Sequence, residues 1–159
     1  MKAIAVALAV AFTTPIFAGS SAAEIRRSST CELETLFRCG VLACAPCGPT
    51  RGTVLHADGA LPRLKARLQG TIWKGKTFHA DGTFTNRWLG GITAGTHTVR
   101  IEPSWLDGQP CLVLQYPPDA RAFPNARDEI RLIGPNTWLG HSYDSATGRT
   151  KNWFVLEGR

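Results

Sequence analysis

The feature that most constrains the fold is a series of short β-type segments, separated by turn signals, in the second half of the chain. Asp81-Gly82 and Asp107-Gly108 are tight-turn dipeptides, and Gly-Gly and Pro-Pro pairs interrupt the chain between other segments. About eight strands are expected, at residues 51–56, 71–78, 83–89, 96–101, 111–116, 128–133, 137–143 and 151–156. Many short strands at short intervals predict an antiparallel barrel or sandwich.

Two short helices are expected in addition to the strands. Ser29 and Glu32 have the spacing of a capping box, and the helix that they begin should end at Gly40. Residues 61–68 predict a second helix, because leucines recur there at helical spacing and Pro62 suits a first turn.

The first 23 residues have the pattern of a cleaved signal peptide. Lys2 precedes an uncharged apolar stretch over residues 3–12, and small residues at 21–23 favour cleavage before Glu24. We therefore expect a secreted or periplasmic protein with a Cys-rich segment at 24–47 and one barrel domain at 48–159. No membrane span is expected, because a span needs about 20 apolar residues and no segment reaches that length.

The charge of the chain is moderately basic. Lysine and arginine number 18 against 12 acidic residues, which gives a formal net charge of +6. The basic residues are spread along the chain and form no block of like charges. Nucleic-acid binders usually carry a denser basic stripe, so a solvated surface is expected and a nucleic-acid partner is not.

Four of the five cysteines lie close together near the N-terminus. They are Cys31, Cys39, Cys44 and Cys47. Outside the cytoplasm such a group predicts two disulfide bridges, with Cys111 left free in a strand. The Cys-x-x-Cys pair could alternatively be redox-active, but β-type sequence follows it where a thioredoxin-like motif needs a helix. A zinc site is disfavoured, because the spacing of the first two cysteines fits no common zinc knuckle.

Several motifs resemble an uncharacterised bacterial family. Its pattern W-x-G-K-x-F, N-R, S-W-L-D-G-x-P and R-D-E-[IL]-R is matched at residues 73–78, 86–87, 104–110 and 127–131, with W-L-G at 138–140 where the family often has Y-L-G. More distantly, Gly48-Pro49-Thr50-Arg51-Gly52 followed by W-x-G-K is similar to the GXWXG-type domain of unknown function. The resemblance covers roughly residues 48–157 and implies a lipocalin-like β-barrel, with no activity to transfer. The expected fold is therefore mainly β, an antiparallel lipocalin-like barrel with two short helices.

Polar residues on the expected strands have two interpretations. Asp128 shares a strand face with Ile130, so it points into a barrel if Ile130 does. Asn86, Asp128 and Tyr143 could then line a cavity and orient a ligand. Alternatively, Arg87 pairs with Glu129 or Asp128 and fixes the register of the strands, which we favour because such cross-strand pairs are common.

Aromatic and histidine residues give further candidates. The five tryptophans, Trp73 and Trp88 among them, either wall an apolar pocket or pack in the core. His141 shares a strand face with Tyr143, and with Asp128 the two could form an acid–base cluster. The histidine spacings suggest no metal site, and no cofactor motif is present. The strand alternation places Lys74 and Lys76 on the face opposite Trp73, as solvated or anion-facing residues.

These patterns favour an exported protein that holds a small, largely apolar molecule inside a barrel. The candidate ligand-binding residues are Trp73, Asn86, Trp88, Asp128, His141 and Tyr143. One alternative is an enzyme that uses the acid–base cluster on a small hydrophobic substrate. Another is an envelope or host-facing interaction protein with a packed barrel and a functional basic surface.

Overall fold

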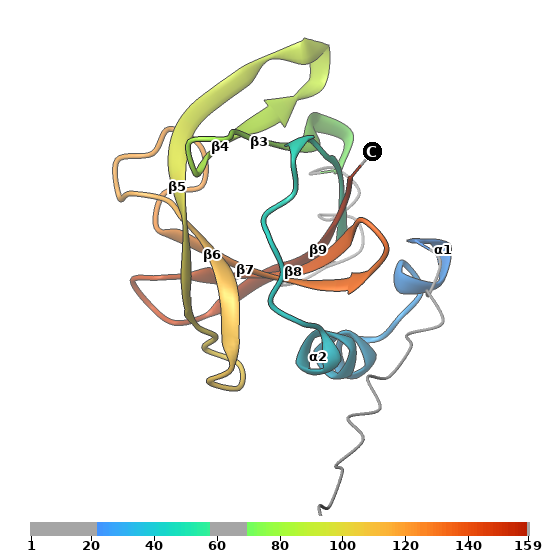
Figure 1. Cartoon of the computed structure of the whole chain (residues 1–159). Coiled ribbons are helices and arrows are strands. Elements are labelled where there is room, and N and C mark those ends of the chain that lie inside the picture. Colours follow the sequence, from blue (N-terminus) through green and yellow to red (C-terminus); the bar gives the residue numbers. More distant parts are fainter. Residues whose placement is uncertain (1–21, 58–69, 159) are drawn as a thin grey trace, which may run out of the picture.

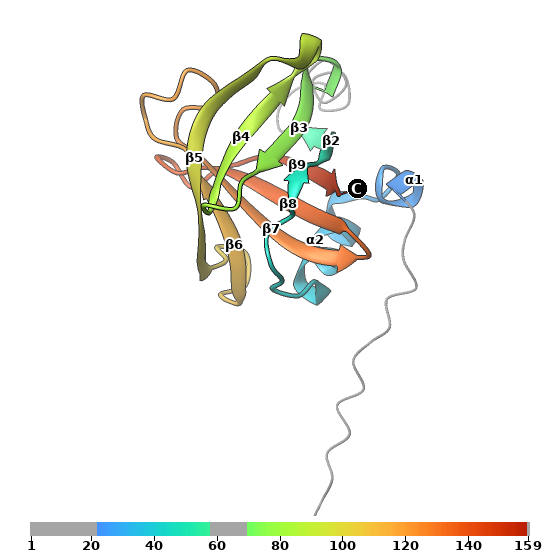
Figure 2. The same ribbon diagram turned by 45° about the horizontal axis from the view of Figure 1, so that its top comes forward.

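The chain folds as an antiparallel β-barrel with helix α2 on its outside (Figures 1 and 2). The structure, a computed structural model, describes residues 22–57 and 70–158. Within them the helices are α1 (Ala22–Ile25), α2 (Thr30–Cys39) and the 3₁₀ turn η1 (Leu89–Gly91). The strands are β1 (Gly48–Pro49), β2 (Arg51–Ala57), β3 (Trp73–Phe78), β4 (Thr83–Trp88), β5 (Thr93–Pro103), β6 (Pro110–Gln115), β7 (Ala126–Gly134), β8 (Thr137–Asp144) and β9 (Thr150–Glu157).

The barrel closes through one continuous segment of chain. The sheet order is β1-β3-β4-β5-β6-β7-β8-β9-β2, with every neighbouring pair antiparallel. Its two ends, β1 and β2, are separated in sequence only by Thr50. The same segment therefore pairs with β3 on one side and with β9 on the other, and the lipocalin-like barrel predicted from the sequence is confirmed.

Thr50 and Gly75 make the closing seam tight. The buried Thr50 donates from its backbone N–H and its hydroxyl to the carbonyl oxygen of Lys76, at 2.8 and 2.9 Å. Gly75 has a φ of 123°, and a Cβ there would overlap the Thr50 carbonyl. Only glycine fits this close approach. Residues 48–52 and residues 73–76 thus meet at the seam.

The strands separate two apolar cores, one on each face of the sheet. The interior core contains Trp73, Phe78, Phe84, Leu112, Leu114, Tyr116, Ala126, Ile130, Trp138, Phe154 and Leu156. The outer core contains Ile25, Leu33, Phe37, Leu55, Cys111, Val113, Ile133, Leu139, Trp153 and Val155, and it lies between the barrel and the helical segment. Strand alternation therefore decides, residue by residue, which side chains can reach the barrel interior.

Helix α2 begins and ends where the sequence predicts. Ser29 is its N-cap, and the reciprocal capping box with Glu32 is present. Leu33 and Phe37 are buried, and the Phe37 ring packs edge-on against Trp153 with centroids 5.9 Å apart. The helix thus covers part of the outer face of the barrel.

The predicted strands are all present, with some differences in their bounds. The strand expected at 71–78 begins at Trp73, because residues 70–72 are helical, and the strand expected at 96–101 spans Thr93–Pro103. The helix expected at 61–68 lies outside the described residues, as do residues 1–21 of the expected signal peptide. Helix α1 was not predicted. The described part of the chain contains no helix of the length and apolarity that a membrane crossing requires.

The predicted disulfide bridges are not formed in this structure. Cys31, Cys39, Cys44 and Cys47 are exposed free thiols, and Cys111 is a buried free thiol in β6. Helix α2 turns Leu33 and Phe37 toward the barrel, which leaves its two cysteines on the solvent side. The placement of Cys111 as a free thiol in a strand is confirmed.

Replacing Gly140 of β8 with alanine should destabilise the barrel. A Cβ at this position would overlap the Phe154 ring inside the barrel. Overpacking of this kind costs about 1–3 kcal/mol of unfolding free energy, which urea denaturation measures. Gly134→Ala is the matched control, since the nearest atom to its Cβ would be 3.9 Å away. Equal losses in the two variants would contradict this account of Gly140.

Candidate functional site

A buried lysine stands at the centre of the barrel interior. Lys76 is only 1% exposed and lies on the same face of β3 as Trp73. The register of β3 against β4 shifts between Trp73 and Gly75, which inserts one extra residue into the strand. This β-bulge reverses the strand alternation, so the prediction that Lys76 lies on the face opposite Trp73 is wrong. Of the two predicted environments, solvent and an anion, Lys76 has the anion, Asp128.

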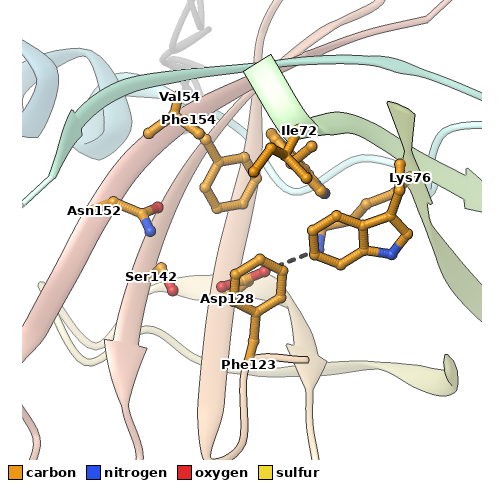
Figure 3. Close-up of a pocket in the computed structure, with 10 residues that line it drawn as sticks. Val54, Ile72, Lys76, Phe123, Asp128, Ser142, Asn152 and Phe154 are labelled. Atoms are coloured by element: carbon orange, nitrogen blue, oxygen red, sulfur yellow. Dashed lines mark ion pairs between the residues drawn. The ribbon is translucent and has the colours of Figure 1, made fainter. Parts of the chain in front are cut away.

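The ammonium of Lys76 has a partner for each of its three N–H groups. Its Nζ lies 3.0 Å from Oδ2 of Asp128 in an ion pair, drawn as a dashed line in Figure 3. It also donates to Oδ1 of Asn86 at 3.2 Å and to the hydroxyl oxygen of Tyr116. Asn86 Oδ1 further accepts from Trp73 Nε1 at 3.1 Å. These bonds join β3 and β4 to β7 and to Tyr116, the residue that follows β6.

Four aromatic rings surround the same ammonium. Its nitrogen is 4.9 Å from the ring centroids of both Phe84 and Tyr116, and 5.5 and 5.7 Å from those of Trp73 and Phe154. Cation–π attraction offsets part of the cost of burying the charge. Burial still lowers the pKa of Lys76, against the opposing effect of the Asp128 carboxylate. Burial likewise raises the pKa of the Tyr116 phenol.

Next to the ion pair, the barrel interior contains a cavity. A cavity of about 120 Å³ is lined by Val54, Ile72, Trp73, Lys76, Trp88, Phe123, Asp128, Ser142, Asn152 and Phe154. Figure 3 shows Phe123, Phe154 and Ile72 around this space, with Ser142 and Asn152 beside Asp128. For comparison, a dry cavity of about 150 Å³ holds one benzene molecule. The cavity therefore suits a molecule of about one ring.

Phe123 covers the cavity from the loop between β6 and β7. Its ring stacks on Trp88, with centroids 5.5 Å apart and an interplanar angle of 19°. Its backbone φ is 60°, which is unusual for a bulky residue. The stacking and the edge contact with Tyr116, at 6.1 Å, hold the ring in place despite this strain.

The structure brings four of the six predicted ligand-binding residues together. Trp73, Trp88 and Asp128 line the cavity, and Asn86 lies directly behind it as a partner of Lys76. The expectation that Asp128 shares the interior face with Ile130 is confirmed.

His141 and Tyr143 lie on the opposite face of the sheet. Asp128 pairs in register with Ser142, so Ser142 faces the cavity and its two neighbours face outward. The His141 ring stacks on Trp153 in the outer core, with centroids 3.9 Å apart and an interplanar angle of 7°. The predicted cluster of Asp128, His141 and Tyr143 therefore does not assemble, and these two residues do not line the cavity.

The outward-facing charged residues of β7 hold in place the turn that connects β5 and β6. Glu129 accepts from the Ser104 hydroxyl at 2.5 Å and from Arg127 Nε at 2.9 Å. Arg131 forms a bidentate pair with Asp107, both bonds at 2.7 Å. Such fork-shaped pairs fix geometry strongly. Glu129 and Arg131 therefore hold neighbouring segments in place outside the cavity.

The predicted pair between Arg87 and Glu129 or Asp128 is not formed. Arg87 donates instead to the carbonyl oxygen of Thr50 at 3.1 Å, on the closing seam. Asp128 pairs with Lys76, and Glu129 with Arg127.

Several site residues were not found from the sequence. They are Lys76, Tyr116, Ser142, Asn152, Phe123, Val54, Ile72 and Phe154. Glycine within the strand at W-K-G-K was the available signal for Lys76, because glycine inside a strand often marks a bulge. Among residues 22–57 and 70–158, no group of three or more metal-ligating side chains is close enough to hold a metal ion.

Comparisons with known proteins support the fold alone. No family model matches this chain, and no curated protein matches it. A crystal structure of a protein from Thermomonospora curvata is similar, with a TM-score of 0.55 and 18% sequence identity. The similarity covers 83% of this chain and 88% of that one. At this identity the likeness concerns the architecture of the barrel.

Breaking the interior ion pair should be far more costly than breaking a surface pair. Lys76→Met or Asp128→Asn leaves a buried charge without its partner, so each should lower the unfolding free energy by about 3–5 kcal/mol. The double variant should cost much less than the sum, as a double-mutant cycle in urea would measure. Lys151→Met is the control. It removes a more exposed pair with Asp144, 3.3 Å apart, worth at most about 1 kcal/mol. Additive losses at Lys76 and Asp128 would contradict the coupling.

His141 should make the protein sensitive to acid. Burial lowers its pKa from 6.5 to about 3, whereas the unfolded chain takes up the proton near 6.5. The contribution of neutral His141 to the unfolding free energy is therefore fully present above pH 6.5, and it is lost as the pH falls from 6.5 toward 3. His141→Phe keeps the stacking on Trp153 and removes this loss.

Between about pH 7 and about pH 4, the unfolding free energy of His141→Phe should fall by roughly 3 kcal/mol less than that of the parent. Urea titrations at each pH measure it. His79→Phe, at an exposed histidine, should behave as the parent does. An unchanged acid profile in His141→Phe would show that other groups cause the acid sensitivity.

Proposed function

We propose that this protein binds one small, largely apolar molecule reversibly inside its barrel. The observation that carries the proposal is the cavity of about 120 Å³ beside the Lys76–Asp128 pair. A largely apolar concavity with a few convergent polar groups is the usual form of a small-molecule site. Barrels of about eight strands are wide enough to hold one such ligand.

The composition of the cavity wall favours an apolar guest. Trp73, Trp88, Phe123 and Phe154 supply four aromatic rings, and Val54 and Ile72 supply aliphatic surface. Burying apolar ligand area against this wall would contribute about 25 cal/mol for each Å² removed from water. The fixed charges are already paired with each other, so they place no demand for a charged guest.

Two other functions have less support. Acid–base catalysis would need Asp128, His141 and Tyr143 at one place, but the last two lie on the outer face of the sheet. An interaction protein with a packed barrel would have no interior cavity. The pattern of residues 1–23 supports a site of action outside the cytoplasm, secreted or periplasmic, as part of the same proposal.

Toluene is a suitable first probe, because it has one ring and no polar group. We expect saturating toluene to raise the thermal unfolding midpoint, since a ligand that binds only the folded state stabilises it. It should also change the tryptophan fluorescence, because Trp73 and Trp88 line the cavity.

Val54→Phe should abolish both effects by filling the cavity. Ile101→Phe adds the same aromatic ring at a position that is 65% exposed and outside the cavity, and should leave both effects intact. Equal responses in the two variants, or no response in the parent, would contradict binding inside the barrel.

A further inference from the structure

Three polar side chains form a row across the inner face of the barrel. Asp128 on β7 pairs in register with Ser142 on β8, and Ser142 pairs with Asn152 on β9. Residues directly opposite each other on neighbouring strands lie on the same face, and all three line the cavity. Figure 3 shows them together on one side of the pocket. The cavity therefore has one polar wall and a largely apolar remainder.

Two members of this row have no hydrogen-bond partner for their side chains in the described part of the chain. The hydroxyl of Ser142 is on a residue only 4% exposed, and the amide of Asn152 is on a half-buried residue. Buried polar groups in native proteins are nearly always hydrogen-bonded. Donors and acceptors that are free at a cavity wall are available to a guest in the cavity.

The charges beside the row exclude an anionic guest. All three N–H groups of Lys76 are already given to Asp128, Asn86 and Tyr116. A ligand carboxylate would therefore find no free ammonium donor and would lie beside the Asp128 carboxylate. Two carboxylates side by side in a buried site repel each other strongly.

The same pair disfavours a cationic guest. The Lys76 ammonium already neutralises Asp128, with 3.0 Å between the charged atoms. A second positive charge would be repelled by Lys76 and would also lose its own hydration in the cavity. The carboxylate of Asp128 still has unused acceptor capacity, because each carboxylate oxygen can accept more than one hydrogen bond.

We propose that the ligand is an uncharged molecule of about one ring that carries a hydroxyl or N–H group. That group donates to Asp128 and exchanges hydrogen bonds with Ser142 and Asn152, while the ring lies among Trp73, Phe123 and Phe154. This inference rests on the proposed function and specifies the chemical class of the guest.

Three probes of nearly equal size test it: toluene, benzyl alcohol and benzoate. Benzyl alcohol should bind at least about tenfold more tightly than toluene, as a hydrogen bond to a charged group implies. Benzoate should not bind measurably at neutral pH. Isothermal calorimetry, or tryptophan fluorescence where heats are small, measures each affinity.

The variant Ser142→Ala/Asn152→Ala should bind toluene as tightly as the parent or better. Its preference for benzyl alcohol should be smaller than that of the parent but not abolished, because the hydrogen bond to Asp128 remains. Ile101→Phe should keep the preference of the parent, because residue 101 is outside the cavity. Thermal unfolding of each variant establishes that it is folded before binding is compared.

The outcomes separate this inference from the proposed function. If toluene binds and benzyl alcohol binds no better, the inference fails while interior binding stands, and the polar row is satisfied by water alone. Tighter binding of benzoate than of benzyl alcohol would overturn the argument from charge. If none of the three probes binds, both the inference and the proposed function fail.

Discussion

The interior of this barrel is organised around the ion pair between Lys76 and Asp128. The two residues come from β3 and β7, which are not neighbours in the sheet, so the pair spans the lumen rather than a ladder between adjacent strands. Burying two charges is costly unless geometry and further hydrogen bonds compensate. Here Asn86, Tyr116 and the surrounding aromatic rings supply that compensation. Both residues of the pair line the cavity, so the position of the cavity depends on them.

One sequence motif is divided between two structural roles by strand alternation. Within Arg127-Asp128-Glu129-Ile130-Arg131, the residues Arg127, Glu129 and Arg131 face outward and fix the hairpin, and Asp128 faces the cavity. The three outward-facing residues of this motif therefore serve the architecture. Asp128 belongs to a site, and only its place on the inner face reveals this.

The sequence predicts where the strands lie, but it does not always predict which face of the sheet a residue occupies or which residue it pairs with. Turn dipeptides and alternation identified the strands, and Ile130 correctly indicated the direction of Asp128. Lys76 was missed because one bulge at Gly75 reverses the alternation along β3. The predicted cluster of Asp128, His141 and Tyr143 is wrong because the register between β7 and β8, which decides which residues share a face with Asp128, is set only in the folded sheet. A shift of one residue exchanges the two faces.

The closing segment has a consequence for when the cavity exists during folding. Val54 comes from β2, and Asn152 and Phe154 come from β9, so the cavity wall includes both sides of a pairing between the second strand and the last one. Contacts this distant in sequence form slowly, because the intervening chain must first be ordered. The cavity wall is thus complete only when β2 is paired with β9, and it is opened if these strands separate. Occupancy and barrel closure are then thermodynamically linked, and a bound guest would suppress local opening of this pair of strands.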